Sequence, residues 1–283
     1  MASTASDVRY FDVQQAEATA VIDRVAGGCG LMATAINECG KVLPPPTFDA
    51  KGGPRPRWDF EPKDRRLAVL LIAAKAVSSM HAVTILWRFV HLQEAWALMR
   101  IVDDCCDDVF LLTTPTGVSA SSTLQDAKLL EFFHTSPIDR AAPSAEPAKP
   151  KTVRRDKIAA ELGNYLHDAT GTDNRHSIIE SFKKLQNVHS GYVHANFWRI
   201  VEMISGQSEE AFHVHMLGTP DPVQAGELAT YIVSKARSVA LAVRKAATFL
   251  GSEEGMRRAE LSDAALTVAD ELDSKRSPIA AES

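Results

Sequence analysis

The chain has 283 residues, and 31 Lys and Arg against 36 Asp and Glu give it a net charge of −5. Hydrophobic residues make up 45% and charged residues 24%, which is ordinary for a globular protein and excludes a disordered or collagen-like chain. A general nucleic-acid binder would be basic, so we expect no double-stranded DNA partner. Four cysteines in so long a chain do not make a disulfide framework, and we expect reduced, buried thiols.

The sequence gives no sign of export or of a membrane anchor. The N-terminal residues lack a cationic start followed by an apolar core, which a secretory signal requires. The longest apolar stretches, 67–74 and 95–99, are far shorter than the roughly 20 residues of a membrane helix. These patterns predict a cytoplasmic protein with no membrane partner.

Two proline-rich stretches divide the chain. Residues 44–62 and 137–150 mix proline with small and charged residues, which is typical of extended connectors. The predicted parts are N-terminal helices (1–43), a connector (44–62), the first half of a bundle (63–134), a linker (135–155), the second half of the bundle (156–251) and a charged, frayed tail (252–283).

Helical periodicity dominates the segments between the connectors, and no segment alternates as a strand would. The first pair of predicted helices is split by the glycines at 27–30. Residues 63–114 contain no Gly or Pro, and a single helix there would span roughly 75 Å, so a break is expected near 78–81. The predicted helices are 13–25, 31–42, 63–77, 82–112, 156–167, 177–206 and 222–250. The sequence therefore predicts an all-α protein, a helical bundle of about four main helices with additional N-terminal helices.

Four aspartates crowd one helical segment, at Asp103, Asp104, Asp107 and Asp108. Like charges four residues apart repel on a helix, so a compensating group is expected. One interpretation is Mg²⁺, which prefers carboxylate oxygens. The stretch from Arg100 to Asp107 resembles the aspartate-rich motif of isoprenoid synthases, and that resemblance implies Asp103, Asp104 and Asp107 as metal ligands. No second acidic motif accompanies it. The alternative is a solvated helix end, neutralised by Arg100 and other bases, with no metal or other cofactor.

A polar stripe follows in the second half of the bundle. Its members succeed one another at steps of four, three, four and four, and they are Lys183, Asn187, Ser190, His194 and Trp198. The stripe is either a site in which His194 transfers protons or a buried network that fixes helix register. His189 and His194 are five residues apart and cannot face one metal together. No metal is expected here.

The segment Ser190–Ala195, with its Tyr-Val-His-Ala sequence, resembles the late helix of bacterial helical proteins that look like relatives of the HEPN superfamily. Active HEPN members are metal-independent RNases with a signature of Arg, a polar residue, three residues of any type and His. The resemblance puts His194 at the histidine, Ser190 at the polar and His189 at the arginine position. Histidine lacks the guanidinium fork that grips phosphate, so Lys183 and Lys184 are the candidate phosphate-binding residues.

Two classes of function stay open. In one, the chain cuts or binds RNA with His194, assisted by His189, Ser190 and Asn187, and the eight basic against five acidic residues of 151–200 suit that role. In the other, the bundle is a non-catalytic binding module or homodimerisation module in which His194 is structural. The missing arginine favours the second class. The isoprenoid-synthase interpretation comes third.

Overall fold

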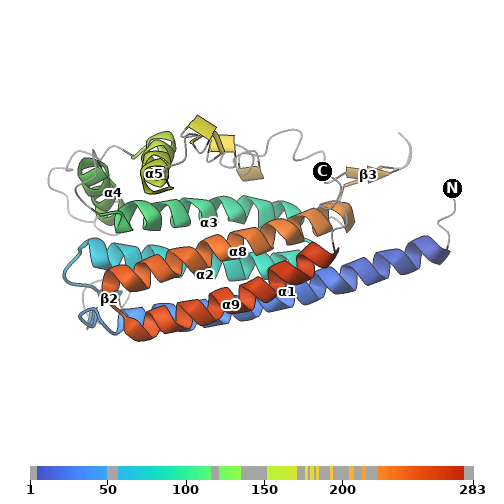
Figure 1. The fold of residues 1–283 in the computed structure, drawn as a ribbon, viewed down its shortest axis with the longest axis horizontal. Coiled ribbons are helices and arrows are strands. Elements are labelled where there is room, and N and C mark those ends of the chain that lie inside the picture. Colours follow the sequence, from blue (N-terminus) through green and yellow to red (C-terminus); the bar gives the residue numbers. More distant parts are fainter. Residues whose placement is uncertain are drawn as a thin grey trace.

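A computed structural model describes residues 5–49, 57–115, 121–134, 152–170, 176–177, 179–181, 183–184, 192–193, 204–206, 212–214 and 222–276. The fold is an all-α bundle, as the sequence predicts (Figure 1). Its long helices are α1 (Ala5–Gly40), α2 (Arg65–Arg88), α3 (Leu92–Thr113), α8 (Pro222–Leu250) and α9 (Glu253–Arg276). Two shorter helices, α4 (Ser121–His134) and α5 (Arg155–Thr170), lie along the outer side of α3 (Figure 1).

Helix α8 lies at the centre and packs against α1, α2, α3 and α9. Its inner face is fully buried and includes Ile232, Val239, Val243 and Ala247. The indole nitrogen of Trp87, near the end of α2, donates a hydrogen bond to the carbonyl of Ala225 at 2.8 Å. This bond satisfies the polar atom of a side chain that is only 2% exposed, and it fixes α2 against the first turn of α8.

Two short antiparallel ribbons accompany the helices. Strand β1 (Thr47–Asp49) pairs with β2 (Arg57–Asp59), within the first proline-rich connector. Strand β3 (Ile204–Gly206) pairs with β4 (Phe212–Val214). The prediction of a helix that continues to Gly206 is therefore wrong at its C-terminal end, because residues 204–206 exchange ladder hydrogen bonds with a second strand.

The break between α2 and α3 lies about ten residues later than the sequence predicts. Residues 78–81 are helical, and two of them, Ser79 and Met80, are buried. The helix ends instead at Phe89–His91, where Val90 adopts a left-handed φ of 53°. The amide of His91 then donates to the carbonyl of Leu86 at 2.9 Å, which closes the end of α2. Phe89 lies at this helix end and is exposed.

The glycines near the N-terminus do not split α1, which is one helix of 36 residues. Gly28 instead permits close packing, because a Cβ there would lie 2.9 Å from Cδ2 of Leu266 on α9. The tail after Ser252, predicted to fray, forms α9, and its Ala259, Leu266 and Ala269 belong to the core. Small residues on both helices allow this pair to approach closely, and that pairing is not visible in the periodicity of either segment.

We expect Gly28→Val to destabilise the protein by about 1–3 kcal/mol, because the added side chain meets Leu266 in a close-packed interface. Urea unfolding followed by circular dichroism measures the change. Gly27→Val is the matched control, since a Cβ at Gly27 meets nothing within 4 Å. Equal stability of the two variants would show that α1 and α9 do not approach as described.

Two stretches in the described part of the chain, Ala16–Gly40 and Arg65–Arg88, are long and apolar enough to cross a membrane by length and composition. Their most apolar windows have a mean hydropathy of 1.2 and 1.8. The prediction from uninterrupted apolar runs missed them, because scattered polar residues interrupt each run. Core helices of soluble proteins also pass this test, and 44% and 56% of the two windows is buried in the bundle.

Candidate functional site

Three of the four aspartates of α3 are buried and Asp104 is half-buried, and basic side chains of α3 and of other helices lie around them. Asp103, Asp107 and Asp108 are each only 6% exposed. The basic residues that form ion pairs with this acidic stretch are Arg100, Lys128, Arg155 and Lys235. Burial of so many charges is tolerated only when they are paired, so the pairing decides what this stretch does.

Asp108 holds the outer helices to the bundle. Its carboxylate accepts two hydrogen bonds from the Arg155 guanidinium of α5, at 2.6 and 3.2 Å, and lies 3.0 Å from the Lys128 ammonium of α4. Lys128 also pairs with Glu131 at 3.2 Å. A fork of two parallel bonds to one carboxylate fixes geometry as well as charge. One side chain of α3 therefore positions both α4 and α5.

The other aspartates pair in different directions. Arg155 reaches Asp104 through Nε at 3.4 Å and donates to its carbonyl at 3.1 Å. Arg100, one turn earlier on α3, lies 3.2 Å from the Asp104 carboxylate. Asp103 points to α8, where the Lys235 ammonium lies 2.5 Å from Oδ1. The stretch thus connects α3 to α8 on one side and to α5 on the other.

Burial is the dominant influence on several ionisable groups here. It raises the pKa of Asp104, although Arg155 and Arg100 oppose that rise. The pKa of Arg155 is raised overall, because the attraction of Asp108 and Asp104 outweighs the opposing effect of burial. Burial also raises the pKa of the Cys105 thiol to about 12, with Asp108 adding to the effect. All four cysteines are free, and three of them, Cys29, Cys39 and Cys106, are buried as predicted, whereas Cys105 is half-buried.

The C-terminal end of α3 is stabilised by groups that the sequence interpretation did not include. The helix continues to Thr113, and it is not a solvated end. Arg65 of α2 donates to the carbonyls of Leu112 and Thr114, the latter at 2.8 Å. Gln125 of α4 donates to the carbonyls of Leu111 and Thr114. A guanidinium at a helix C-terminus offsets the unfavourable position of the acidic residues relative to the helix dipole.

The arrangement does not favour a metal. Among the residues that the structure describes, no group of three or more His, Cys, Asp or Glu is placed to hold a metal ion. Asp103 and Asp104, two of the three ligands that the isoprenoid-synthase resemblance implies, are already neutralised by lysine and arginine. A bound cation would have to displace those partners.

We therefore expect millimolar Mg²⁺ to leave the melting temperature unchanged, because a ligand stabilises only a native state that it binds. Differential scanning fluorimetry with and without Mg²⁺ measures this. A clear rise that disappears in the Asp103→Asn/Asp107→Asn double variant would instead assign a metal site to α3.

Four members of the polar stripe lie outside the described residues, namely Asn187, Ser190, His194 and Trp198. His189 also lies outside them. Lys183 is described, and its ammonium pairs with Glu180 at 3.1 Å on the outside of the molecule. Lys184 is exposed. Ile179 lies against Gly163 of α5, so closely that a Cβ at Gly163 would meet Cγ1 of Ile179.

One residue of the late-helix motif is placed firmly. The Tyr192 ring stacks on Trp96 of α3, with the ring centroids 5.6 Å apart and an interplanar angle of 12°. The Trp96 ring also packs against that of Tyr231 of α8, with the ring centroids 5.1 Å apart. The Lys235 ammonium lies 5.4 Å from the centroid of the Tyr231 ring. Aromatic contacts of this kind add to the energy of burial. Tyr192 is thus held on the side of α3 that faces Tyr231 and Lys235 of α8.

Sequence reasoning missed the basic and aromatic members of this cluster. Lys235 carries the clearest signal, because it lies three residues after Ile232 and four before Val239, at the spacing of the buried face of α8. A charge on that face requires a buried partner, and the aspartates of α3 are the obvious candidates. Lys128 and Arg155 carry no comparable signal, since each lies in a polar segment.

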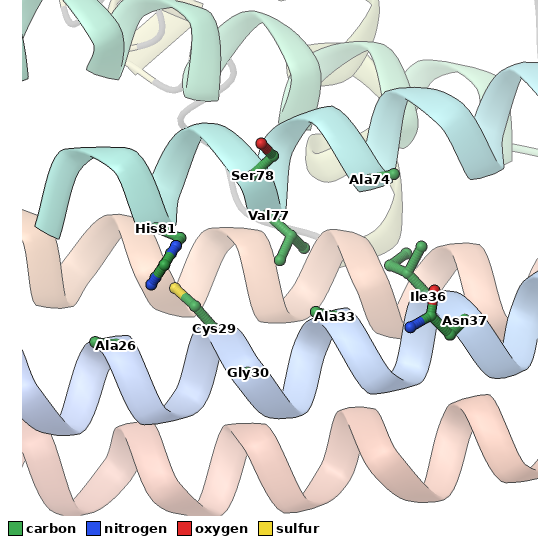
Figure 2. A pocket seen from close by; sticks show the side chains of 10 residues that line it. All are labelled: Ala26, Cys29, Gly30, Ala33, Ile36, Asn37, Ala74, Val77, Ser78 and His81. Atoms are coloured by element: carbon green, nitrogen blue, oxygen red, sulfur yellow. The ribbon is translucent and has the colours of Figure 1, made fainter. Parts of the chain in front are cut away.

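A groove lies on another face of the bundle, between α1 and α2. It has a volume of about 350 Å³. Its lining residues are mostly small or apolar and come from both helices: Ala26, Cys29, Gly30, Ala33, Ile36 and Asn37 of α1, and Ala74, Val77, Ser78 and His81 of α2. Figure 2 shows Val77 and His81 pointing from α2 toward α1, where Ala26, Gly30 and Ala33 leave space. None of the residues that line the groove belongs to the polar stripe between Lys183 and Trp198.

No family model matches the chain, and neither a curated protein nor a solved structure does.

Proposed function

We propose that the protein is a non-catalytic helical module of HEPN-like architecture that binds a second copy of itself through the α1–α2 face. The groove between these helices carries the proposal. Its lining includes no Asp, Glu, Lys or Arg, and the titratable side chains in it are those of Cys29 and His81. Grooves that are apolar and built from small residues suit an incoming helix face rather than a charged substrate.

The chemistry of the α3 cluster also supports a non-catalytic role. Catalytic acids and bases need a site where substrate reaches them, whereas the aspartates of α3 are buried and engaged by bases of α4, α5 and α8. The cluster fits a framework that fixes the helices relative to one another. Such a framework keeps the α1–α2 face rigid for binding.

A variant that fills the groove tests the proposal. Gly30 lines the groove, and a Cβ there meets nothing within 4 Å, so Gly30→Leu introduces a side chain without strain. We expect Gly30→Leu to weaken self-association at least about tenfold, which is the effect of losing roughly 1.4 kcal/mol of binding energy. Sedimentation velocity over a concentration series measures the change.

Gly27→Leu is the matched control. Gly27 lies three residues away on the same helix, is also free of contacts at its Cβ position and does not line the groove. It should associate like the wild type. Equal weakening by both variants, or by neither, would contradict the assignment of the binding face.

RNA cleavage is the second candidate function. The stacking of Tyr192 on Trp96 favours it, because this contact packs one residue of the late-helix motif against the bundle. The His194→Ala variant separates the two functions. Under our proposal, the wild type cuts single-stranded RNA weakly or not at all, and His194→Ala lowers stability by roughly 1–3 kcal/mol. Robust metal-independent cleavage that a stable His194→Ala variant loses would establish the RNase.

A further inference from the structure

We infer that Phe89 and Ile85 of each copy insert into the α1–α2 groove of the other, in an antiparallel pair of α2 helices related by a two-fold axis. This inference rests on the proposed function and specifies its geometry. The partner is therefore a second copy of this chain, and each copy contributes one apolar projection and one groove. A two-fold interface needs this kind of self-complementary surface.

The projection and the groove share one face of α2. Ser78, His81, Ile85 and Phe89 follow one another at steps of three, four and four. Ser78 and Phe89 are eleven residues apart, which places them within about 20° around the helix and roughly 16 Å along it. Ile85 is 42% exposed and Phe89 is 67% exposed, so both project from the surface just beyond the groove.

The groove can receive an apolar side chain of this size. Its volume of about 350 Å³ falls in the range of ligand pockets, about 300–1,000 Å³. Gly30 and Ala33, which form its α1 wall, are exposed and small. Burying an exposed aromatic ring in a close-fitting hollow is the commonest source of strong binding energy at protein interfaces.

The charges on this face permit it to pack against itself. Two copies related by a two-fold axis present the same charges to each other, so an unpaired charge would oppose a like charge. Between Ser78 and Phe89 the one permanently charged residue is Arg88. Its guanidinium is neutralised within the same copy by Asp23 of α1, at 2.6 Å.

Two experiments on the full chain test the geometry. The first is sedimentation velocity of Phe89→Ala, for which we expect dissociation to increase about thirtyfold, as expected when an aromatic hot-spot side chain is truncated. Val223→Ala is the matched control, because Val223 is 68% exposed, close to the 67% of Phe89, and lies on α8 rather than on this face. It should leave self-association unchanged.

The second experiment is cross-linking with a short bismaleimide. Ala82 lies close to the midpoint between Ser78 and Phe89, so the two copies of an Ala82→Cys variant should meet near the axis and cross-link efficiently. Val268→Cys on α9, at a residue that is 40% exposed, should not cross-link. The native thiols give little background, because burial raises the pKa of Cys29 and of the half-buried Cys105 to about 12 and also raises those of Cys39 and Cys106.

The outcomes separate this inference from the proposed function. A wild-type dimer that Phe89→Ala leaves intact and that Ala82→Cys does not cross-link overturns the geometry but keeps self-association. A wild type that is monomeric throughout overturns both. A monomeric chain that floats with vesicles of phosphatidylcholine and phosphatidylglycerol also overturns both, and it assigns the face to a membrane.

Discussion

Asp108→Ala should destabilise the protein by about 3–5 kcal/mol, because it removes one member of a buried ionic cluster. The substitution leaves the Lys128 ammonium, whose side chain is 8% exposed, without the carboxylate that lies 3.0 Å away. It also removes both hydrogen bonds of the Arg155 guanidinium to that carboxylate. Desolvated cations that lose a partner are costly even though Lys128 keeps Glu131 and Arg155 keeps Asp104, so α4 and α5 should detach or the whole bundle should lose stability. Urea unfolding and limited proteolysis measure the two results.

Asp270→Ala is the matched control for this change. Asp270 forms an ion pair with Arg237 at 2.6 Å, the same distance as between Asp108 and Arg155. The side chains of Asp270 and Arg237 are both exposed, unlike those of Asp108 and Arg155. Exposed ion pairs contribute about 0–1 kcal/mol, so Asp270→Ala should be nearly neutral. If Asp108→Ala proved as mild as Asp270→Ala, the ionic cluster would not position the outer helices.

Lys235→Met should cost about 3–5 kcal/mol as well, because it leaves the Asp103 carboxylate buried beside an apolar side chain. The Lys235→Met/Asp103→Leu double variant replaces both charges with apolar groups of similar shape. We expect the double variant to recover at least half of the lost stability, since paired buried charges and apolar replacements are often equivalent. A double-mutant cycle from thermal or urea unfolding measures the coupling.

The absence of recovery would have a specific meaning. Additive losses in the double variant would show that Asp103 is held by groups other than Lys235 and that the α3–α8 contact is not ionic in origin. The same variants also test whether the ionic cluster takes part in self-association. Lys235→Met should leave self-association unchanged, because Lys235 lies on α8 and does not line the α1–α2 groove.

The periodicity of the chain predicts its class and several elements well. Helix α8 has the predicted bounds, and α5 begins one residue before the predicted start at Asp156. The bounds of these helices could be predicted because they depend on the apolar stripe and the flanking residues of each segment alone. The continuous α1 and the helical α9 were not predictable in this way, since Gly28 and Leu266 stabilise each other across 238 residues of chain.

The candidate site could also be predicted from the sequence only in part. The aspartates of α3 stand out in the sequence, and their need for a compensating group follows from simple repulsion. The identity of that group does not follow, because Lys128, Arg155 and Lys235 come from three different helices. The groove is a property of two helices together, and the small residues that form it look like ordinary core positions in each helix alone.

The most direct test of this account is the mass of the wild-type chain in solution, measured by light scattering coupled to size-exclusion chromatography. The concentration should be raised from about 1 µM to about 100 µM, a range that covers modest protein affinities. Self-association through the α1–α2 face predicts that the mass rises from that of a single chain, 30.8 kDa, to twice that value. A mass that stays at 30.8 kDa over the whole range would contradict it.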